Sequence, residues 1–66
     1  MTREEAFAKS AEEGIWITHE YFTEDDRILV DKDGYITTDD KYTVSIERFN
    51  TDHQAEGWDV GWSIYE

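Results

Sequence analysis

The sequence predicts a small α+β domain, in which one N-terminal helix packs on an antiparallel sheet of about four to five short strands. Residues 3–13 have the composition and the start signal of a helix. After Gly14 the pattern changes to an alternation of apolar and polar residues, which is typical of strands, and short polar turns separate the alternating segments. Because the chain has no internal repeat and no low-complexity segment, we expect residues 1–66 to form a single acidic α+β domain.

The predicted helix begins directly after Thr2. The Thr2 hydroxyl can accept a hydrogen bond from the backbone N–H of Glu5 while the Glu5 side chain reaches back, which is the capping-box pattern. Glu5 and Lys9 have the i,i+4 spacing of a favourable ion pair, and Gly14 is placed to end the helix in the left-handed conformation. The helix needs to pack on other elements to be stable, because its apolar face is narrow. That face consists of Phe7, Ala8 and Ala11.

Five segments after the helix have the alternating pattern of strands. They are residues 15–20, 27–30, 35–37, 41–49 and 58–65. Polar turns are predicted between them at residues 23–26, 31–34 and 38–40. The second of these turns has the sequence Asp-Lys-Asp-Gly, so residues 27–37 should form a hairpin. Residues 50–57 are predicted as the longest loop, because this segment is polar except for one alanine.

The alternation also predicts which side chains reach the core. Within residues 41–49, Phe49 is expected on the face opposite to Tyr42, Val44 and Ile46. One face of the last strand consists of Trp58, Val60, Trp62 and Ile64. The two tryptophans of that face are expected in the core rather than in a stacking platform for a base. Trp16 and Tyr65 lie on the opposite faces of their strands and are expected to be exposed.

The chain is strongly acidic, with 17 Asp and Glu residues against six Lys and Arg and a net charge of −11 at pH 7. This charge repels phosphates, which argues against direct contact with nucleic acid or with an anionic membrane. No uninterrupted apolar run exceeds the length of Ile28–Val30, which is too short to span a bilayer. Three Trp, four Tyr and three Phe residues supply core area, so we expect a folded cytoplasmic protein rather than a disordered acidic tail.

Two patterns bear on metal binding. Residues 31–40 have the acidic residues of a calcium loop but not their spacing, because a leucine falls on position 1 when Gly34 takes the glycine position of an EF-hand. A hairpin turn is the favoured interpretation. His19 and His53, with Asp52 beside the second, allow a site of two histidines and a carboxylate, but a structural histidine bonded to a backbone carbonyl is favoured. No metal and no cofactor is therefore expected.

Catalysis has little support in the sequence. There is no cysteine and no Gly-x-Ser-x-Gly pattern, and the serines fall in regular predicted elements. The four glycines are isolated, so no phosphate-binding loop is indicated. We predict that the protein is not an enzyme.

The acidic residues point to two interpretations. The charge of −11 exceeds the magnitude of roughly 2–8 that solubility requires of a small domain. The surface either confers solubility alone or docks on a basic groove of another protein, including a groove that normally holds DNA or RNA. The second interpretation predicts a set of partner-binding acids, with two aromatic residues as apolar anchors. The set is Glu12, Glu13, Trp16, Tyr21, Glu24, Asp25, Asp26, Asp39 and Asp40.

Short motifs spread over nearly the whole chain resemble those of small early-region proteins of tailed bacteriophages. The motifs are Glu4-Glu5-Ala6, Gly14-Ile15-Trp16-Ile17-Thr18-His19-Glu20-Tyr21-Phe22, Asp33-Gly34, Phe49, and Trp58 with Gly61-Trp62. The layout also resembles, more loosely, the fold family of the Thoeris anti-defence sponge proteins. The resemblance implies a phage accessory protein that acts by binding a host or defence component.

Sponge members capture cyclic nucleotide signals in pockets between subunits, which gives an alternative function as an oligomeric sponge for a nucleotide signal. Here that role would use Arg27, Tyr35, Lys41 and Arg48 together with the aromatic residues, and Lys32 is the other cation available to a phosphate pocket. The acid excess opposes an anionic ligand, so a protein partner is favoured. A homo-oligomer stays possible, because short strands leave open sheet edges while the charge works against their pairing.

Overall fold

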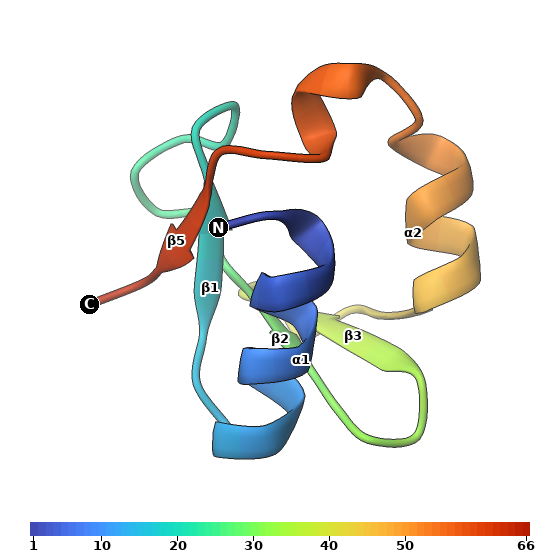
Figure 1. Ribbon diagram of the computed structural model, residues 1–66. Coiled ribbons are helices and arrows are strands. Elements are labelled where there is room, and N and C mark those ends of the chain that lie inside the picture. The colour runs from blue at the N-terminus through green and yellow to red at the C-terminus, as the bar shows by residue number, and fades with distance from the viewer.

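The computed structural model describes residues 1–66 and confirms the α+β prediction, with an N-terminal helix packed on a five-stranded antiparallel sheet (Figure 1). The elements are α1 (Arg3–Glu13), β1 (Ile17–His19), β2 (Ile28–Val30), β3 (Tyr35–Thr38), β4 (Thr43–Ser45), α2 (Ile46–Asp52), the 3₁₀ helix η1 (Glu56–Trp58) and β5 (Trp62–Ile64). The strand order is β4-β3-β2-β1-β5, so the last strand joins the sheet beside the first. Neither α-helix is long and apolar enough to cross a membrane.

Both helices pack on the same face of the sheet. Helix α1 contacts β1, β2 and β5, while α2 contacts β3 and β4. In Figure 1 the two helices lie side by side, and the segment that leads from α2 to β5 passes over one end of both. The buried residues form one apolar cluster: Ala6, Phe7, Ile17, Ile28, Val30, Ile36, Phe49 and Trp62.

The start and the end of α1 are as the sequence predicts. The Thr2 hydroxyl accepts from the backbone N–H of Glu5 at 3.2 Å, and the Glu5 carboxylate accepts from the backbone N–H of Thr2 at 3.0 Å. Hydrogen bonding by Thr2, first of all from its backbone N–H, lowers the pKa of the Glu5 carboxyl group. Gly14 ends the helix with φ at +67°. The expected ion pair between Glu5 and Lys9 is wrong, because Glu5 is held in the cap and Lys9 pairs with Glu13 at 2.9 Å.

The apolar face of α1 also differs from the prediction. Ala6 and Phe7 are buried, but Ala8 is exposed and its place is taken by Ser10. The Ser10 hydroxyl donates to the carbonyl oxygen of Ile15 at 2.7 Å and accepts from the backbone N–H of Val30 at 2.9 Å. A polar side chain is therefore buried here because both of its hydrogen-bonding capacities are used, and it joins α1 to β2.

The hairpin of β2 and β3 is confirmed. Leu29 lies opposite Thr37 in the register, and one Asp31 carboxylate oxygen accepts from the backbone N–H groups of Asp33 and Tyr35 at 2.9 and 3.0 Å. The acidic residues after β2 therefore close a turn, as the favoured interpretation of the calcium-like pattern expects.

The predicted strand at 41–49 is wrong beyond Ser45. The Ser45 hydroxyl accepts from the backbone N–H of Arg48 at 3.1 Å and so starts α2. Ile46 and Phe49 are three residues apart, which places both on one face of a helix but on opposite faces of a strand. Phe49 is buried in the core, so burial of this ring favours the helix. As a result, the predicted loop at 50–57 is occupied at one end by α2 and at the other by η1.

The predicted last strand is also shorter than expected. Gly61 has φ at +87°, which breaks the extended pattern before β5. Trp62 is buried, as predicted, whereas Val60 is 55% exposed. Trp58 belongs to η1 and packs against the core while partly buried. Ile64 keeps the same face as Trp62 but lies at the edge of the sheet and is exposed.

Candidate functional site

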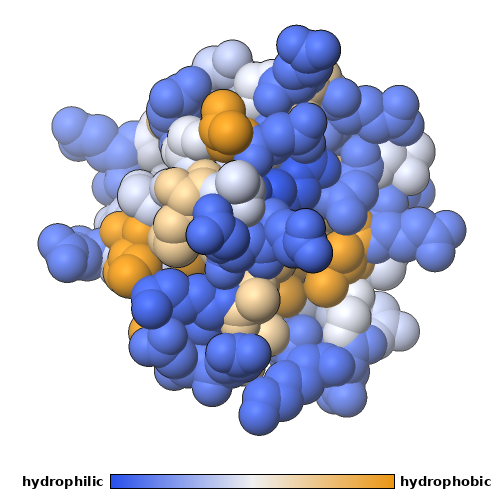
Figure 2. All heavy atoms as spheres, in the orientation of Figure 1, coloured by the Kyte–Doolittle hydropathy of each residue, from blue (hydrophilic) through white to orange (hydrophobic).

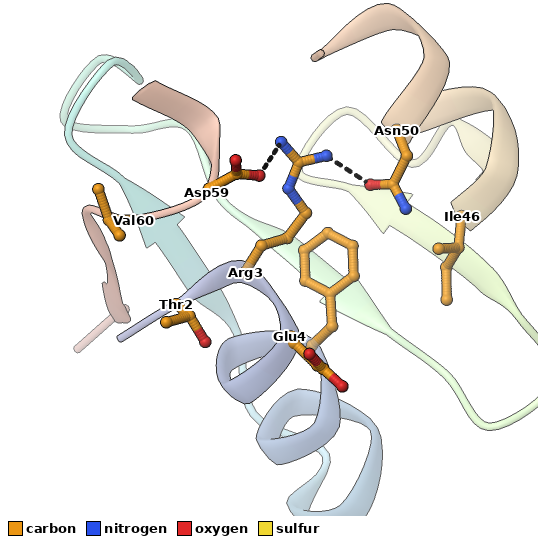
Figure 3. A pocket seen from close by; sticks show the side chains of 8 residues that line it. Thr2, Arg3, Glu4, Ile46, Asn50, Asp59 and Val60 are labelled. Carbon is orange, nitrogen blue, oxygen red and sulfur yellow. Dashed lines mark hydrogen bonds and ion pairs between the residues drawn. The ribbon is translucent and has the colours of Figure 1, made fainter. Parts of the chain in front are cut away.

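The largest cavity, of about 730 Å³, lies between α1 and α2. Figure 3 shows Arg3 at its centre, with Asp59 and Asn50 joined to the guanidinium and Glu4, Ile46 and Val60 around it. The Arg3 side chain is 14% exposed, which is low for an arginine.

Every part of the Arg3 guanidinium has an acceptor from this chain. Its Nε donates to the carbonyl oxygen of Trp58 at 3.1 Å, and Nη1 donates to the side-chain oxygen of Asn50 at 2.8 Å. Nη2 donates to the carbonyl oxygen of His53 at 2.7 Å and lies 3.4 Å from a carboxylate oxygen of Asp59. Arg3 thus joins α1 to α2 and to the segment after α2, and its charged group is used by the fold.

The two histidines support the same segment. Nε2 of His19 lies 2.9 Å from the carbonyl oxygen of Gly57 and 2.6 Å from that of Val60. Nδ1 of His19 accepts from the backbone N–H of Tyr21 at 3.0 Å, so the hydrogen is on Nε2. The structural interpretation of His19 is confirmed, because both ring nitrogens are bonded to the backbone and neither is free for a metal.

His53 also packs against Trp58. Its Nδ1 is 2.8 Å from the carbonyl oxygen of Phe49, and its ring stacks on the Phe49 ring with centroids 3.9 Å apart. The ring centroids of His19 and His53 are 4.4 and 4.5 Å from that of Trp58. No group of three or more His, Cys, Asp or Glu side chains is arranged to hold a metal ion.

A second cavity, of about 260 Å³, lies where the β1–β2 loop meets the β3–β4 turn and α2. We call it the aspartate pocket. Its apolar lining residues are Phe22, Ile28, Tyr42 and Phe49. Its acidic lining residues are Asp26, Asp39 and Asp40, and Arg27 and Thr38 complete the lining. Asp40 is exposed at the mouth, while Asp26 and Asp39 are half-buried.

The carboxylates of the aspartate pocket have no cation of this chain within 4 Å. The ion pairs of the structure are Arg3–Asp59, Lys9–Glu13 and Arg48–Asp52. Arg27 lines the pocket, but its guanidinium carbon lies over the rings of Trp16 and Tyr65, 5.3 and 4.9 Å from their centroids. The pocket is therefore an anionic recess with an apolar wall.

The structure brings together three of the predicted partner-binding residues and separates the others. Asp26, Asp39 and Asp40 share the aspartate pocket although they come from two different loops. Glu24 lines a third cavity of about 320 Å³. Asp25 is exposed in the β1–β2 loop, and Glu12 and Glu13 are exposed at the end of α1 and line no cavity.

The two predicted apolar anchors differ in accessibility. Tyr21 is 59% exposed, and its ring packs edge-on against Trp58 with its hydroxyl beside Gly57. Trp16 is half-buried under Arg27, as is Tyr65, so the expectation that these two rings are exposed is wrong. The cation between them covers both rings.

Two of the pocket residues that sequence reasoning missed, Tyr42 and Phe49, belong to the segment that it assigned to a strand. Tyr42 was expected to share a strand face with Val44, yet it precedes β4 and is 72% exposed at the pocket. Phe49 reaches the pocket only because it belongs to α2. Ser45, which caps α2, was the signal in the sequence that could have assigned Phe49 to a helix.

The residues of the alternative sponge function are dispersed. Tyr35, Lys41 and Arg48 line none of the cavities, and Arg48 is paired with Asp52. Arg27 lines a cavity that is dominated by aspartates.

Comparison of the chain with protein-family models, curated proteins and solved structures gives no match. The resemblance to early-region phage proteins therefore stays a prediction. Function is inferred instead from the geometry of the aspartate pocket and from the charge of the surface around it.

Proposed function

We propose that the protein is a non-enzymatic binding protein that docks its acidic surface on a basic site of another protein. The basic site is one that suits phosphates, including a groove that otherwise holds nucleic acid, because carboxylates on a rigid surface compete for the same cations.

The observation that carries this proposal is that four of the six Lys and Arg side chains already contact groups of the same chain, so few cations are left to neutralise the acidic surface. Arg3 is held by internal acceptors, Lys9 and Arg48 pair with acids of their own helices, and Arg27 lies over two aromatic rings. Three of the 17 acidic side chains have a cation within 4 Å. The remaining acids supply the negative field of the surface, and Figure 2 shows hydrophilic residues over most of one face with small, separated apolar patches.

The nature of the partner follows from the same proposal. The resemblance to early-region phage proteins adds that the partner is a component of a bacterial host or of its defence, met in the host cytoplasm and inhibited by occupation of its basic site. A −11 charge would accelerate association with such a site, since opposite charges steer encounter.

A salt-dependence measurement tests the proposal. The immobilised chain captures partners from bacterial lysate at low salt, and the purified partner is then titrated at rising salt. We expect affinity to fall steeply between about 50 and 300 mM salt, because screening shortens the range of the charge interaction. An affinity that stays flat over this range would contradict the proposal.

The matched control removes charge without touching the core. The variant with Glu12→Gln, Glu13→Gln, Asp39→Asn and Asp40→Asn should bind the same partner more weakly. Unchanged affinity in this variant would leave solubility as the only role of these acids.

A further inference from the structure

We infer that the aspartate pocket receives an arginine side chain of the basic partner. The inference rests on the proposed function and names the group that the acidic surface recognises. Three features of the pocket support it: its apolar wall, its carboxylates without a cation of this chain within 4 Å, and the way in which the same fold accommodates an arginine of its own.

The apolar wall comes from the edge of the core. Phe49 is 7% exposed and Ile28 is 4% exposed, and both line the pocket with part of their surface. Phe22 is half-buried beside them, and Tyr42 stands at the rim with 72% of its surface exposed. A side chain that enters this recess therefore contacts aromatic rings along its stem, which suits the apolar methylenes of a long cationic residue.

The charge of the pocket favours a cation from outside. Asp39 and Asp40 have no cation of this chain within 4 Å, and the guanidinium of Arg27 is directed to Trp16 and Tyr65. An apolar ligand would leave these carboxylates without compensation, and an anionic ligand would be repelled.

Arginine fits this combination better than lysine. A guanidinium is planar, stacks on aromatic rings and bonds carboxylates in a bidentate manner, whereas an ammonium is compact and strongly hydrated. The aspartate pocket offers aromatic rings and carboxylates together, which are the two groups that favour the planar cation.

The cavity between the helices provides an internal precedent. There Arg3 lies against acceptors of Asn50 and Asp59, and Phe7 lines the same recess. The aspartate pocket has the same kinds of lining groups, aromatic and acidic, but the guanidinium of Arg27 lies over rings outside it rather than beside its carboxylates. A partner arginine would give the carboxylates of the aspartate pocket a cation, as Arg3 does for Asp59.

The test uses two peptides of equal charge, acetylated and amidated hexaarginine and hexalysine, titrated into the full-length chain at about 50 mM salt. Backbone amide shifts are followed by NMR. We expect hexaarginine to shift the amides of Asp26, Asp39, Asp40 and Tyr42 and to bind more tightly than hexalysine. The double variant Asp39→Asn and Asp40→Asn should weaken hexaarginine binding by at least about tenfold, because two charge-assisted contacts are lost.

A charge-matched control separates the pocket from general acidity. The double variant Glu12→Gln and Glu13→Gln removes the same charge at the end of α1 and should weaken binding by less than about threefold. Equal weakening by both pairs, equal binding of the two peptides, or shifts confined to other surfaces would overturn the arginine pocket while the acidic docking function stands. No binding of either peptide would overturn both. Amide spectra that match the wild type away from the pocket show that each variant is folded.

Discussion

The cavity between the helices and the aspartate pocket have similar lining groups, but they differ in whether their charged groups are paired within the chain. The cavity between α1 and α2 is lined by an arginine whose three side-chain nitrogens each have an acceptor of the same chain. The aspartate pocket has carboxylates and aromatic rings, but no cation of the chain lies within 4 Å of its carboxylates. The comparison shows that composition does not separate a folding contact from a binding site. The separating property is whether the charged groups already have a partner of opposite charge within the chain.

The largest expected effect on stability comes from removing the guanidinium of Arg3. Arg3→Met keeps the length of the stem but removes the donors to Trp58, Asn50 and His53. We expect the free energy of unfolding to fall by about 3 kcal/mol, because buried acceptors lose their partners. Urea titration measures the change. The control Arg48→Met removes an exposed i,i+4 partner of Asp52 and should cost less than about 0.5 kcal/mol. Similar losses in both variants would show that Arg3 acts only through its charge.

The next largest effect is expected at His19, which holds the segment between α2 and β5 through the carbonyl oxygens of Gly57 and Val60. His19→Leu removes the bonds to the carbonyl oxygens of Gly57 and Val60 and to the N–H of Tyr21. We expect a loss of about 2 kcal/mol in the free energy of unfolding. His53→Leu removes one backbone bond and should cost about half as much. Thermal melts of the two variants compare them, and an equal or larger cost at His53 would contradict the role given to His19.

A smaller effect, of opposite sign, is expected beside the aspartate pocket. Lys41 has φ at +68°, a left-handed conformation that L side chains adopt at a cost. Lys41→Gly should therefore raise the free energy of unfolding by about 0.5–1 kcal/mol, after allowance for the larger entropy of glycine in the unfolded chain. Urea titration detects this gain. A loss of stability would mean that the Lys41 side chain has a structural role that its exposed position does not indicate.

The smallest effect concerns a carboxylate that the fold does use. Bonds from Thr2 lower the pKa of Glu5 below its ordinary 4.5. A carboxyl group with a lowered folded-state pKa adds stability that is present above about pH 4.5 and is lost as the pH falls through the folded value. Glu5→Gln keeps the capping geometry, so wild type and variant should differ in stability at pH 7 and converge near pH 3. A difference that grows toward acid pH would contradict this assignment.

Much of the fold was predictable, because local signals and tertiary packing agree over the first two thirds of the chain. Thr2 and Gly14 define α1, and Asp31 with Gly34 define the hairpin of β2 and β3. Prediction failed where the apolar residues fit both the two-residue spacing of a strand and the three-residue spacing of a helix. Between Tyr42 and Phe49 the alternation favours a strand, but burial of Phe49 and the cap at Ser45 favour a helix.

The candidate site was predictable only in part. The sequence identifies Asp26, Asp39 and Asp40 as turn acids, but their common pocket depends on the pairing of β2 with β3 and on the position of α2. The role of Arg3 was not foreseen, because its acceptors come from residues 47 to 55 positions later in the chain. Such contacts between distant segments have no signature in local spacing.

The most direct test of the arginine pocket measures stability and binding on the same preparation of the Asp39→Asn and Asp40→Asn variant. We predict that hexaarginine affinity falls at least about tenfold. The free energy of unfolding should stay unchanged or rise by up to about 0.5 kcal/mol, because repulsion between neighbouring carboxylates is relieved. A variant that loses stability and keeps its affinity would contradict the binding role, since these aspartates would then belong to the fold, as Arg3 does.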